Sequence, residues 1–216
     1  MVFVIFRKGI RPIRKLFEFM KRYILVVVLL SIGLKINAQQ NEKVAYFASG
    51  CFWCVESIFE SVKGVRDAVS GYSGGAYKNP TYKKVAYGLT DHAEAVVVYY
   101  NPDVVSFKDL VTVYYDSHNP TTVNGQYPDF GTQYRSIAFY ETEQEKEIIQ
   151  NKINQLNKEV YSGKIATEVK QFVKFYKAED YHQNFKKRNP NNSYIKAISI
   201  PRLIKFRKKT TIPLKN

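Results

Sequence analysis

The chain has 216 residues, a length that fits one domain with terminal extensions better than two full domains. Hydrophobic residues make up 45% of the sequence and aromatic residues 15%, so the chain can bury one sizeable core without disulfide staples. A formal net charge of +14 would indicate a nucleic-acid-binding protein only if the positive charges gathered on the folded body.

The positive charge lies at the two ends of the chain. Residues 1–38 contain eight lysines and arginines against one acidic residue, Glu18, and so account for half of the net charge. From Arg202 to Lys215 there are six more basic residues and no acidic one. The body between these ends is nearly neutral, so we expect no nucleic-acid partner, and we expect residues 208–216 to form a solvated basic tail.

The first 38 residues have the composition of a secretory signal. A basic stretch precedes the apolar run Tyr23–Leu34, and Ala38 is a small residue at a suitable cleavage position. The run is shorter than the ~20 apolar residues that a transmembrane helix needs. We therefore predict export by a signal peptide to the periplasm or another extracytoplasmic space, with Met20 as the more natural start. An uncleaved membrane anchor is the alternative.

The predicted elements of the body alternate between strands and helices. Alternating apolar and polar residues predict a strand at 43–48, and apolar residues at helical spacing predict a helix from Cys51 to about Val62. Further strands are predicted at 64–72 and 93–100. The segment between them, at 76–90, has the composition of an irregular, tyrosine-rich loop.

The second half begins with a predicted helix at 106–116, for which Ser106 is a suitable N-cap. Residues 118–134 are rich in Gly, Pro, Asn and Thr, which is typical of a functional loop rather than a simple connector. The remaining predicted elements are a strand at 135–140, a helix at 142–160 with Thr142 and Glu145 at capping-box spacing, and a strand at 168–177 followed by coil. This order predicts a single α+β domain with a mixed or antiparallel sheet and long coil segments.

The only two cysteines of the chain, Cys51 and Cys54, lie where the first predicted strand meets the first predicted helix. A cysteine at a helix N-terminus ionises more easily, because the helix dipole and the free amide groups stabilise a thiolate. Two cysteines at this spacing share one face of a helix and can form a disulfide after modest unwinding.

Three interpretations of the pair compete. A structural disulfide closing so short a ring would constrain the unfolded chain very little. A zinc site would need two further ligands, and the three histidines (His92, His118 and His182) show no ligand spacing, so we predict no metal. A redox-active pair explains the position best, and its default form is a general thiol–disulfide oxidoreductase. Phe52 and Trp53 between the cysteines are bulky for a site that docks protein disulfides.

The segment Gly50-Cys51-Phe52-Trp53-Cys54-Val55-Glu56 resembles the signature of the peptide methionine sulfoxide reductase A family. Further segments resemble this family in the same order, and they are 71–75, 79–82, 88–96, 118–121, 129–136 and 178–183. The resemblance spans roughly Lys43 to Arg207. It departs at Asn119, where the family usually has Asp, and at Phe185, where Tyr is common.

This resemblance implies a ferredoxin-like two-layer core within a reductase domain of residues 39–207. It also implies an enzyme that reduces methionine S-sulfoxide, free or in proteins, to methionine and so repairs oxidised proteins. The expected partners are oxidised proteins or peptides and a thioredoxin-like reductant. The resemblance implies no bound cofactor, and we expect a monomer.

The resemblance further implies how the reaction is carried out. Cys51 would attack the sulfoxide sulfur as a thiolate, and Glu94, kept protonated by a partly dry aromatic cleft, would protonate the oxygen. Without the resemblance, Glu94 would be interpreted as a surface residue of its strand. Tyr82 and Tyr134 match the family's hydroxyl donors to that oxygen.

Other positions match the binding site of the family. Phe52 and Trp53 would form the pocket for the S-methyl group, and Asp129 would order the site and bind the substrate backbone. His182 and Glu179 match a motif near the family's C-terminus, and we expect only a supporting structural role for them.

The enzyme needs a second thiol to return from its oxidised state. Attack on the sulfoxide leaves Cys51 as a sulfenic acid, which a nearby thiol condenses to a disulfide. Family members differ in where the resolving cysteine lies, and many carry it in a C-terminal tail that contains none here. We therefore predict a Cys51–Cys54 disulfide. The alternative is a one-thiol enzyme whose sulfenic acid is reduced by an external thiol.

Overall fold

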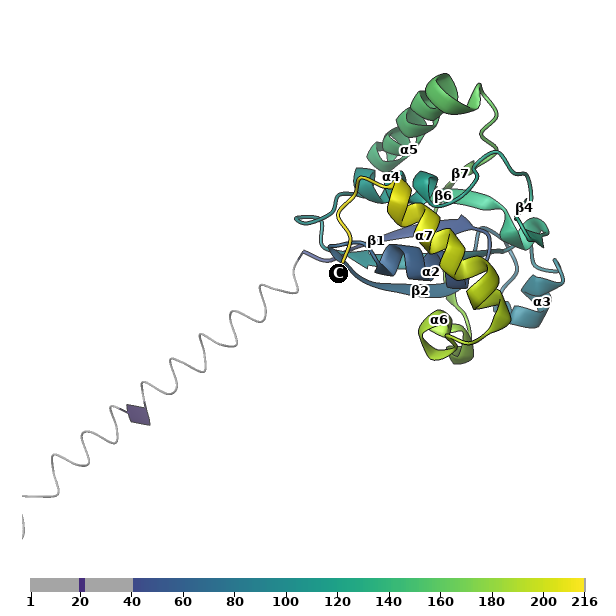
Figure 1. The fold of residues 1–216 in the computed structure, drawn as a ribbon, viewed down its shortest axis with the longest axis horizontal. Coiled ribbons are helices and arrows are strands. Elements are labelled where there is room, and N and C mark those ends of the chain that lie inside the picture. The colour runs from purple at the N-terminus through teal and green to yellow at the C-terminus, as the bar shows by residue number, and fades with distance from the viewer. Residues whose placement is uncertain (1–19, 22–40, 216) are drawn as a thin grey trace, which may run out of the picture. The chain divides into compact units, whose positions relative to one another are not determined.

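The computed structural model describes residues 20–21 and 41–215 (Figure 1). The chain divides into two compact units, Met1–Asn41 and Glu42–Asn216, and the second carries the architecture that follows. The predicted signal segment lies outside the described residues except for Met20 and Lys21. Within the described ranges, no helix is both long enough and apolar enough to cross a membrane.

A mixed six-stranded sheet is the framework of the second unit (Figure 1). The strands lie in the order β7-β6-β1-β3-β2-β8, and all neighbours are antiparallel except β6 and β7. Their bounds are β1 Lys43–Ser49, β2 Val65–Ser73, β3 Ala93–Tyr100, β6 Ser136–Tyr140, β7 Glu168–Gln171 and β8 Tyr176–Lys177. A separate two-stranded hairpin consists of β4 (Gly125–Gln126) and β5 (Asp129–Phe130).

Four of these strands form a ferredoxin-like core with two helices. Helix α2 (Phe52–Glu60) connects β1 to β2, and helix α4 (Phe107–Asp116) lies between β3 and β6 in the chain. The spatial order β6-β1-β3-β2 with these two helices is the antiparallel ferredoxin-like arrangement. The predicted α+β fold with a mixed sheet is confirmed.

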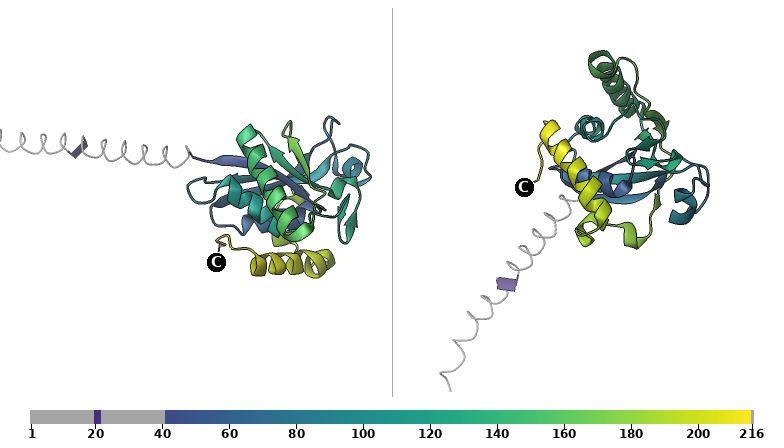
Figure 2. Two further views of the ribbon diagram at one scale, coloured as in Figure 1. Left: turned by 90° about the horizontal axis from the view of Figure 1, so that it is seen from above. Right: turned by 45° about the vertical axis from the view of Figure 1, so that its right-hand side comes forward.

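The two faces of the sheet are covered by different structures. On one face, α2, α4 and α5 (Glu143–Leu156) pack against β1 and β3 in the main core. Helix α7 (Ile200–Lys209) adds Phe206 to this core from the outside and runs across α2 (Figures 1 and 2). The other face is covered by Phe172 and Phe175. Because both faces are covered, the central strand β3 is buried along nearly its whole length.

The prediction of a single last strand at 168–177 is wrong. Residues 168–171 form β7 at one edge of the sheet, and residues 176–177 form β8 at the opposite edge. The segment between them crosses the sheet, where Phe172 stacks on Tyr46 with 3.7 Å between ring centroids. Phe172 and Phe175 are partly buried in the crossing, whereas Val173 between them is exposed.

The two predicted loops contain short elements. Residues 76–90 include helix α3 (Tyr82–Ala86), and residues 118–134 include the β4–β5 hairpin and the 3-10 turn η1 (Thr132–Tyr134). Both segments lie at the edge of the candidate site, so these short elements fix the positions of Tyr82 and Tyr134.

The helix starts follow the predicted capping residues. Ser106 and Asp109 exchange both hydrogen bonds of a capping box at the start of α4. At the start of α5, Thr142 Oγ1 accepts from the backbone N–H of Glu145 at 3.2 Å. The Glu145 carboxylate instead accepts from the N–H of Glu141, one residue earlier than predicted. A π-helical turn, η2 (Asn157–Tyr161), then extends α5.

The expectation of a solvated basic tail is also wrong. After η3 (Asp180–His182) and α6 (Phe185–Arg188), the π-helical turn η4 (Ile195–Ser199) leads directly into α7. Beyond α7, the backbone N–H of Lys215 donates to the Ser61 carbonyl at 2.8 Å, and Leu214 forms a β-bridge with Val62. Apolar residues spaced between the basic ones hold this segment on the domain.

Candidate active site

The strand-to-helix junction places Cys51 at the N-terminus of α2. Strand β1 ends at Ser49, and Gly50 has a φ of +83°, a left-handed conformation that favours glycine. A Cβ atom at Gly50 would lie 2.7 Å from Gln126 Cβ, so a larger residue would displace the β4 strand. Cys51 is the N-cap of α2, and its carbonyl accepts from the N–H of Cys54 at 3.1 Å.

The two thiols are both free and both buried, yet their environments shift their pKa values in opposite directions. Burial raises the pKa of Cys51 well above its usual value, and the neighbouring Cys54 and Glu94 raise it further. The pKa of Cys54 is lowered to about 6, first by the hydrogen bond from Cys51 and then by the charge of Arg202. At Cys51, burial therefore opposes the effect that the helix N-terminus has on the pKa of the thiol.

Glu94 lies on β3, directly at the start of the helix that carries Cys51. Its Oε2 accepts from the backbone N–H of Phe52 at 3.0 Å, and its side chain is 1% exposed. Burial raises the pKa of Glu94 to about 8, and Asp129 raises it further. At neutral pH the carboxyl group therefore carries its proton, as a general acid requires.

Tyr82 and Tyr134 approach the same place from the two short elements. Burial, and then the Glu94 carboxyl group, raise the pKa of Tyr82 to about 12. The pKa of Tyr134 is raised by the same two causes in the same order, and Cys51 contributes to both shifts. Both phenols keep their protons at neutral pH and can donate to an oxygen bound beside Glu94.

Aromatic side chains form a wall next to Cys51. Phe52 is buried and stacks with Tyr82 at 6.3 Å between ring centroids. Trp53 is only partly buried and stacks on Phe185 with centroids 3.7 Å apart. The indole Nε1 of Trp53 donates to His182 Nδ1 at 3.2 Å, which fixes the orientation of the ring. Such a wall can hold a methyl group by apolar contact.

Asp129 and Glu179 each hold tyrosines of the site in place. Asp129 accepts a hydrogen bond from the Tyr194 hydroxyl, and burial raises the pKa of its carboxyl group. Glu179 accepts from the Tyr82 backbone N–H at 2.9 Å and from the Tyr72 hydroxyl at 2.7 Å. Glu179 thus fixes the start of α3, which agrees with the supporting role expected for it.

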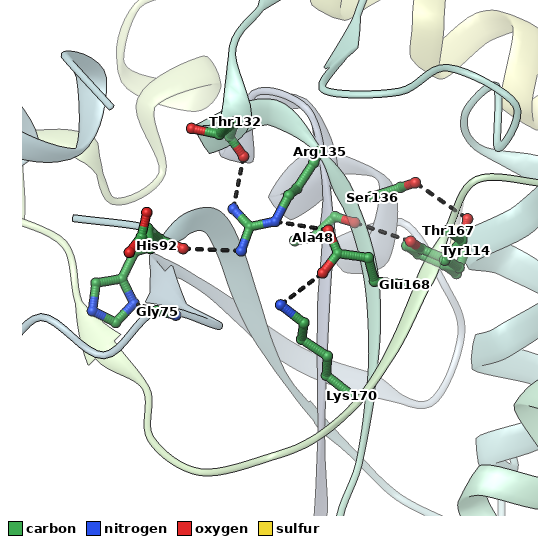
Figure 3. Close-up of polar contacts among 11 residues, drawn as sticks. Ala48, Gly75, His92, Tyr114, Thr132, Arg135, Ser136, Thr167, Glu168 and Lys170 are labelled. Atoms are coloured by element: carbon green, nitrogen blue, oxygen red, sulfur yellow. Dashed lines mark hydrogen bonds and ion pairs between the residues drawn. The ribbon is translucent and has the colours of Figure 1, made fainter. Parts of the chain in front are cut away.

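Arg135 holds in place the loop that carries Tyr134 (Figure 3). Its guanidinium donates to the carbonyls of Thr132 at 2.8 Å and Asp91 at 2.9 Å. It also pairs with Glu168 of β7 at 2.9 Å. One cation therefore ties η1 to the turn before β3, the strand on which Glu94 lies, and to the edge of the sheet.

The structure brings together the residues predicted from the sequence and adds others. The acid Glu94, the phenols of Tyr82 and Tyr134, and Asp129 all act electrostatically on one another or on Cys51. Three residues of the C-terminal segment, Tyr194, Ser199 and Arg202, were missed. Their only signal in the sequence was the apolar spacing of the tail. In the described part of the chain, no cluster of His, Cys, Asp or Glu side chains could hold a metal ion.

Comparison with known proteins agrees with this geometry. Residues 43–213 match the family model described as peptide methionine sulfoxide reductase. A peptide methionine sulfoxide reductase MsrA of Rhodopirellula baltica is 43% identical over 173 residues, which cover 80% of this chain and 90% of that protein. An MsrA of Pasteurella multocida is 44% identical over 165 residues, covering 76% and 94% respectively.

Solved structures show the same fold. The reduced form of Mxr1 from Saccharomyces cerevisiae matches with a TM-score of 0.65 at 36% identity, covering 71% of this chain and 89% of that one. Methionine sulfoxide reductase A of Corynebacterium diphtheriae matches with a TM-score of 0.65 at 32% identity, covering 71% and 78%. On the family match and these identities, the chain belongs to the peptide methionine sulfoxide reductase A family of oxidoreductases.

Proposed function

We propose that this chain reduces the S epimer of methionine sulfoxide, free or in proteins, to methionine. The observation that carries the proposal is the buried Glu94 carboxyl group, protonated at neutral pH and seated on the N-terminus of the helix that carries Cys51. An acid held beside a thiol is what removal of a sulfoxide oxygen requires, because that oxygen leaves poorly without a proton.

The first step transfers one oxygen atom. The sulfur of Cys51, as a thiolate, attacks the sulfoxide sulfur while Glu94 delivers a proton to the oxygen, and Tyr82 and Tyr134 donate hydrogen bonds to it. The attack forms a transient S–S bond between Cys51 and the substrate sulfur. The hydroxyl group then passes from the substrate sulfur to the Cys51 sulfur, while the S–S bond breaks and leaves its electron pair on the substrate sulfur. Methionine leaves, and Cys51 becomes a sulfenic acid. The methyl group of the substrate lies against Phe52 and Trp53, and Asp129 binds its backbone.

The second step returns the enzyme to a reducible state. Cys54 forms a disulfide with Cys51 and water is released. The chain has no further cysteine to reopen that disulfide, so the electrons come from an external dithiol of the thioredoxin type. No prosthetic group takes part in these steps.

The deciding assay offers the purified chain an S-sulfoxide peptide and its R epimer with dithiothreitol as reductant. Methionine should form from the S epimer only, and the Cys51→Ser variant should form none. A folded protein that reduces insulin disulfides but releases no methionine would instead be a general thiol–disulfide oxidoreductase.

Residues 1–38 carry a second part of the proposal. Their basic start, apolar run and Ala38 support the view that they export the enzyme to an extracytoplasmic space and are then removed. The enzyme would then act as a monomer on oxidised exported proteins. A protein mass corresponding to a start at Gln39 is expected in the extracytoplasmic fraction, and an intact N-terminus there would favour the membrane anchor.

A further inference from the structure

The C-terminal segment from Tyr194 to Lys209 packs against the helix that carries Cys54. Helix α7 packs on α2, which carries Cys54 as its third residue. The Tyr194 hydroxyl lies 4.0 Å from Cys54 Sγ, and Arg202 and Ser199 both lower the pKa of that thiol. Cys54 thus lies beside a part of the chain about 140 residues away.

The helical geometry of the segment explains this convergence. The turn η4 is π-helical, so its hydrogen bonds link residues i and i+5, and residues five apart lie on the same side. Tyr194 and Ser199 are five residues apart. Arg202 follows Ser199 by three residues in α7, which keeps it on that same face.

Arg202 is held in place by backbone groups rather than by a carboxylate. Its Nε donates to the Ser117 carbonyl at 2.9 Å, and its Nη2 donates to the Ser49 carbonyl at 2.9 Å. Its Nη1 would lie 3.5 Å from a Cβ atom at Gly50, so the guanidinium reaches the backbone beside Cys51. Among the described residues, no ion pair includes Arg202. Its positive charge is therefore left to act on the thiol pair.

Ser199 provides an independent sign of a ligand. Its side chain is 1% exposed, and its hydroxyl has no hydrogen-bond partner in the described part of the chain. A buried hydroxyl without a partner costs free energy, and a neighbouring thiolate would satisfy it. The Tyr194 hydroxyl differs, because it already donates to Asp129, so we assign it no proton for the sulfur.

We propose that Ser199 and Arg202 form a binding site for the Cys54 thiolate, here named the Cys54 cradle, which makes Cys54 the nucleophile that resolves oxidised Cys51. Both are positioning residues, since they act through Cys54 and touch no substrate. The inference rests on the proposed reductase function and identifies what drives its second step.

The other charged or titratable groups near Cys54 are Asp129 of β5, whose carboxyl group accepts from Tyr194 and also interacts with Arg202, and groups of α2, α6 and β3. Cys51 donates a hydrogen bond to Cys54 from the start of the same helix, and Lys186 of α6 adds a second positive charge nearby. Glu94 of β3 is neutral at pH 7, because its pKa is raised to about 8, and so does not oppose the negative charge. When Cys51 becomes a sulfenic acid, it no longer offers its thiol proton. The cradle is unchanged by that oxidation and continues to stabilise the Cys54 thiolate.

The resolving step joins Cys54 to Cys51 and releases one water molecule. The Cys54 thiolate attacks the sulfur of the Cys51 sulfenic acid, the S–S bond forms, and the S–O bond of Cys51 breaks. The oxygen takes a proton from bulk water and leaves as a water molecule. Cys54 is oxidised, Cys51 is reduced from the sulfenic to the disulfide level, and no further oxidant or reductant is needed.

The first test measures the ionisation of Cys54 directly. In the Cys51→Ser variant of the full chain, Cys54 is the only thiol, so thiolate absorbance near 240 nm against pH titrates this one group. We expect a midpoint below the ~8.5 of a free cysteine. Adding Arg202→Met should raise the midpoint by about one pH unit, and Arg202→Lys should restore most of the difference. Ser199→Ala, which removes a hydroxyl without another partner, should raise it by less.

Lys205→Met is the matched control for this series. Lys205 lies on the exposed side of α7, so its loss removes the same charge from the same helix without touching Cys54. Its midpoint should stay unchanged. The proposal would be wrong if the Cys51→Ser variant titrated with a midpoint near ~8.5. It would also be wrong if neither Arg202→Met nor Ser199→Ala shifted the midpoint.

The second test separates the two steps in the otherwise unmodified enzyme. After mixing with one equivalent of substrate, chromatography measures methionine, and alkylation with mass spectrometry measures sulfenic acid and disulfide. Arg202→Met should slow disulfide formation about tenfold at pH 5, which lies below both midpoints, because less Cys54 is ionised, and the rate should recover as pH rises toward 9. A merely structural role would give no recovery with pH, which would contradict the proposal. If the unmodified enzyme releases no methionine, the proposed function is wrong. The titration of Cys54 still tests whether Ser199 and Arg202 stabilise its thiolate.

Discussion

The surroundings of Cys51 and Cys54 differ sharply, although the two thiols lie within one turn of the same helix. Cys51 faces β3, where burial and Glu94 raise its pKa. Cys54 faces the C-terminal segment, and its pKa is lowered to about 6, first by the hydrogen bond from Cys51 and then by the charge of Arg202. The two thiols interact closely, so they titrate as a pair. Burial of Cys51 opposes the effect of the helix N-terminus on it, whereas a positive charge from a distant segment favours ionisation of Cys54.

The largest effect is expected when the two thiols are removed one at a time. Cys51→Ser should lower methionine formation at least about 10⁴-fold, because the nucleophile is lost. Cys54→Ser should still release one equivalent of methionine per enzyme and leave Cys51 as a sulfenic acid. Single-turnover chromatography with mass spectrometry of the protein measures both outcomes. A full first turnover by Cys51→Ser would reverse the assignment of the two thiols.

The next effect concerns the acid that distinguishes the Cys51 side. Glu94→Gln keeps the shape but removes the transferable proton, so kcat/KM should fall about 10²- to 10⁴-fold. In the unmodified enzyme the rate should decline as pH rises through about 8, because Glu94 loses its proton there. That alkaline decline should be missing from the pH profile of Glu94→Gln. If the variant kept the same decline, another group would be the acid.

A smaller effect tests a buried acid on α2 that is separate from the sulfurs. Burial raises the pKa of Glu56 to about 7, although its carboxylate accepts from Ser70 Oγ at 2.5 Å and from the Asn184 N–H at 2.7 Å. The folded state then holds this proton at a pH where the unfolded chain has released it. The stability linked to Glu56 is therefore complete below pH 4.5 and is lost as pH rises through about 7.

Glu56→Gln should remove this dependence, which amounts to at most about 3 kcal/mol of unfolding free energy over that range. Urea unfolding at pH 5 and pH 8 measures it, and the alkaline decline in activity should remain as in the unmodified enzyme. A loss of that decline would mean that Glu56 rather than Glu94 sets the pH profile.

The smallest effect is expected at the aromatic wall beside Cys51, where Phe185 stacks on Trp53. Phe185→Ala removes the ring that stacks on Trp53, so KM should rise about fivefold, the equivalent of about 1 kcal/mol. The rate of disulfide formation after the first turnover should stay the same. Phe185→Tyr should keep the low KM. A slower second step in Phe185→Ala would show that this wall serves Cys54 as well.

Much of the fold was predictable because its signals are local. The valine- and tyrosine-rich strand at 93–100 and the caps at Ser106 and Thr142 depend on neighbouring residues, and the structure shows them in place. The segment 168–177 was misjudged because its mixture of apolar and polar residues suits one paired strand as well as a chain that crosses a sheet. Only tertiary structure distinguishes these two cases.

The residues around Cys51 could be predicted from the sequence, whereas those around Cys54 could not. The residues near Cys51 are fixed by short motifs, so a resemblance could assign Glu94, Tyr82 and Tyr134 before any coordinates. No motif indicates Arg202, because its effect depends on how α7 packs across α2. Glu94 also shows the limit of pattern analysis, since its strand context alone suggested exposure, whereas its side chain is 1% exposed.

The contact between Arg202 and Ser49 has a consequence for folding. The two residues are 153 positions apart, so the surroundings of the thiol pair are complete only once the C-terminal segment has packed on α2. A chain that has formed its sheet but lacks this packing would carry both cysteines without their distant cation.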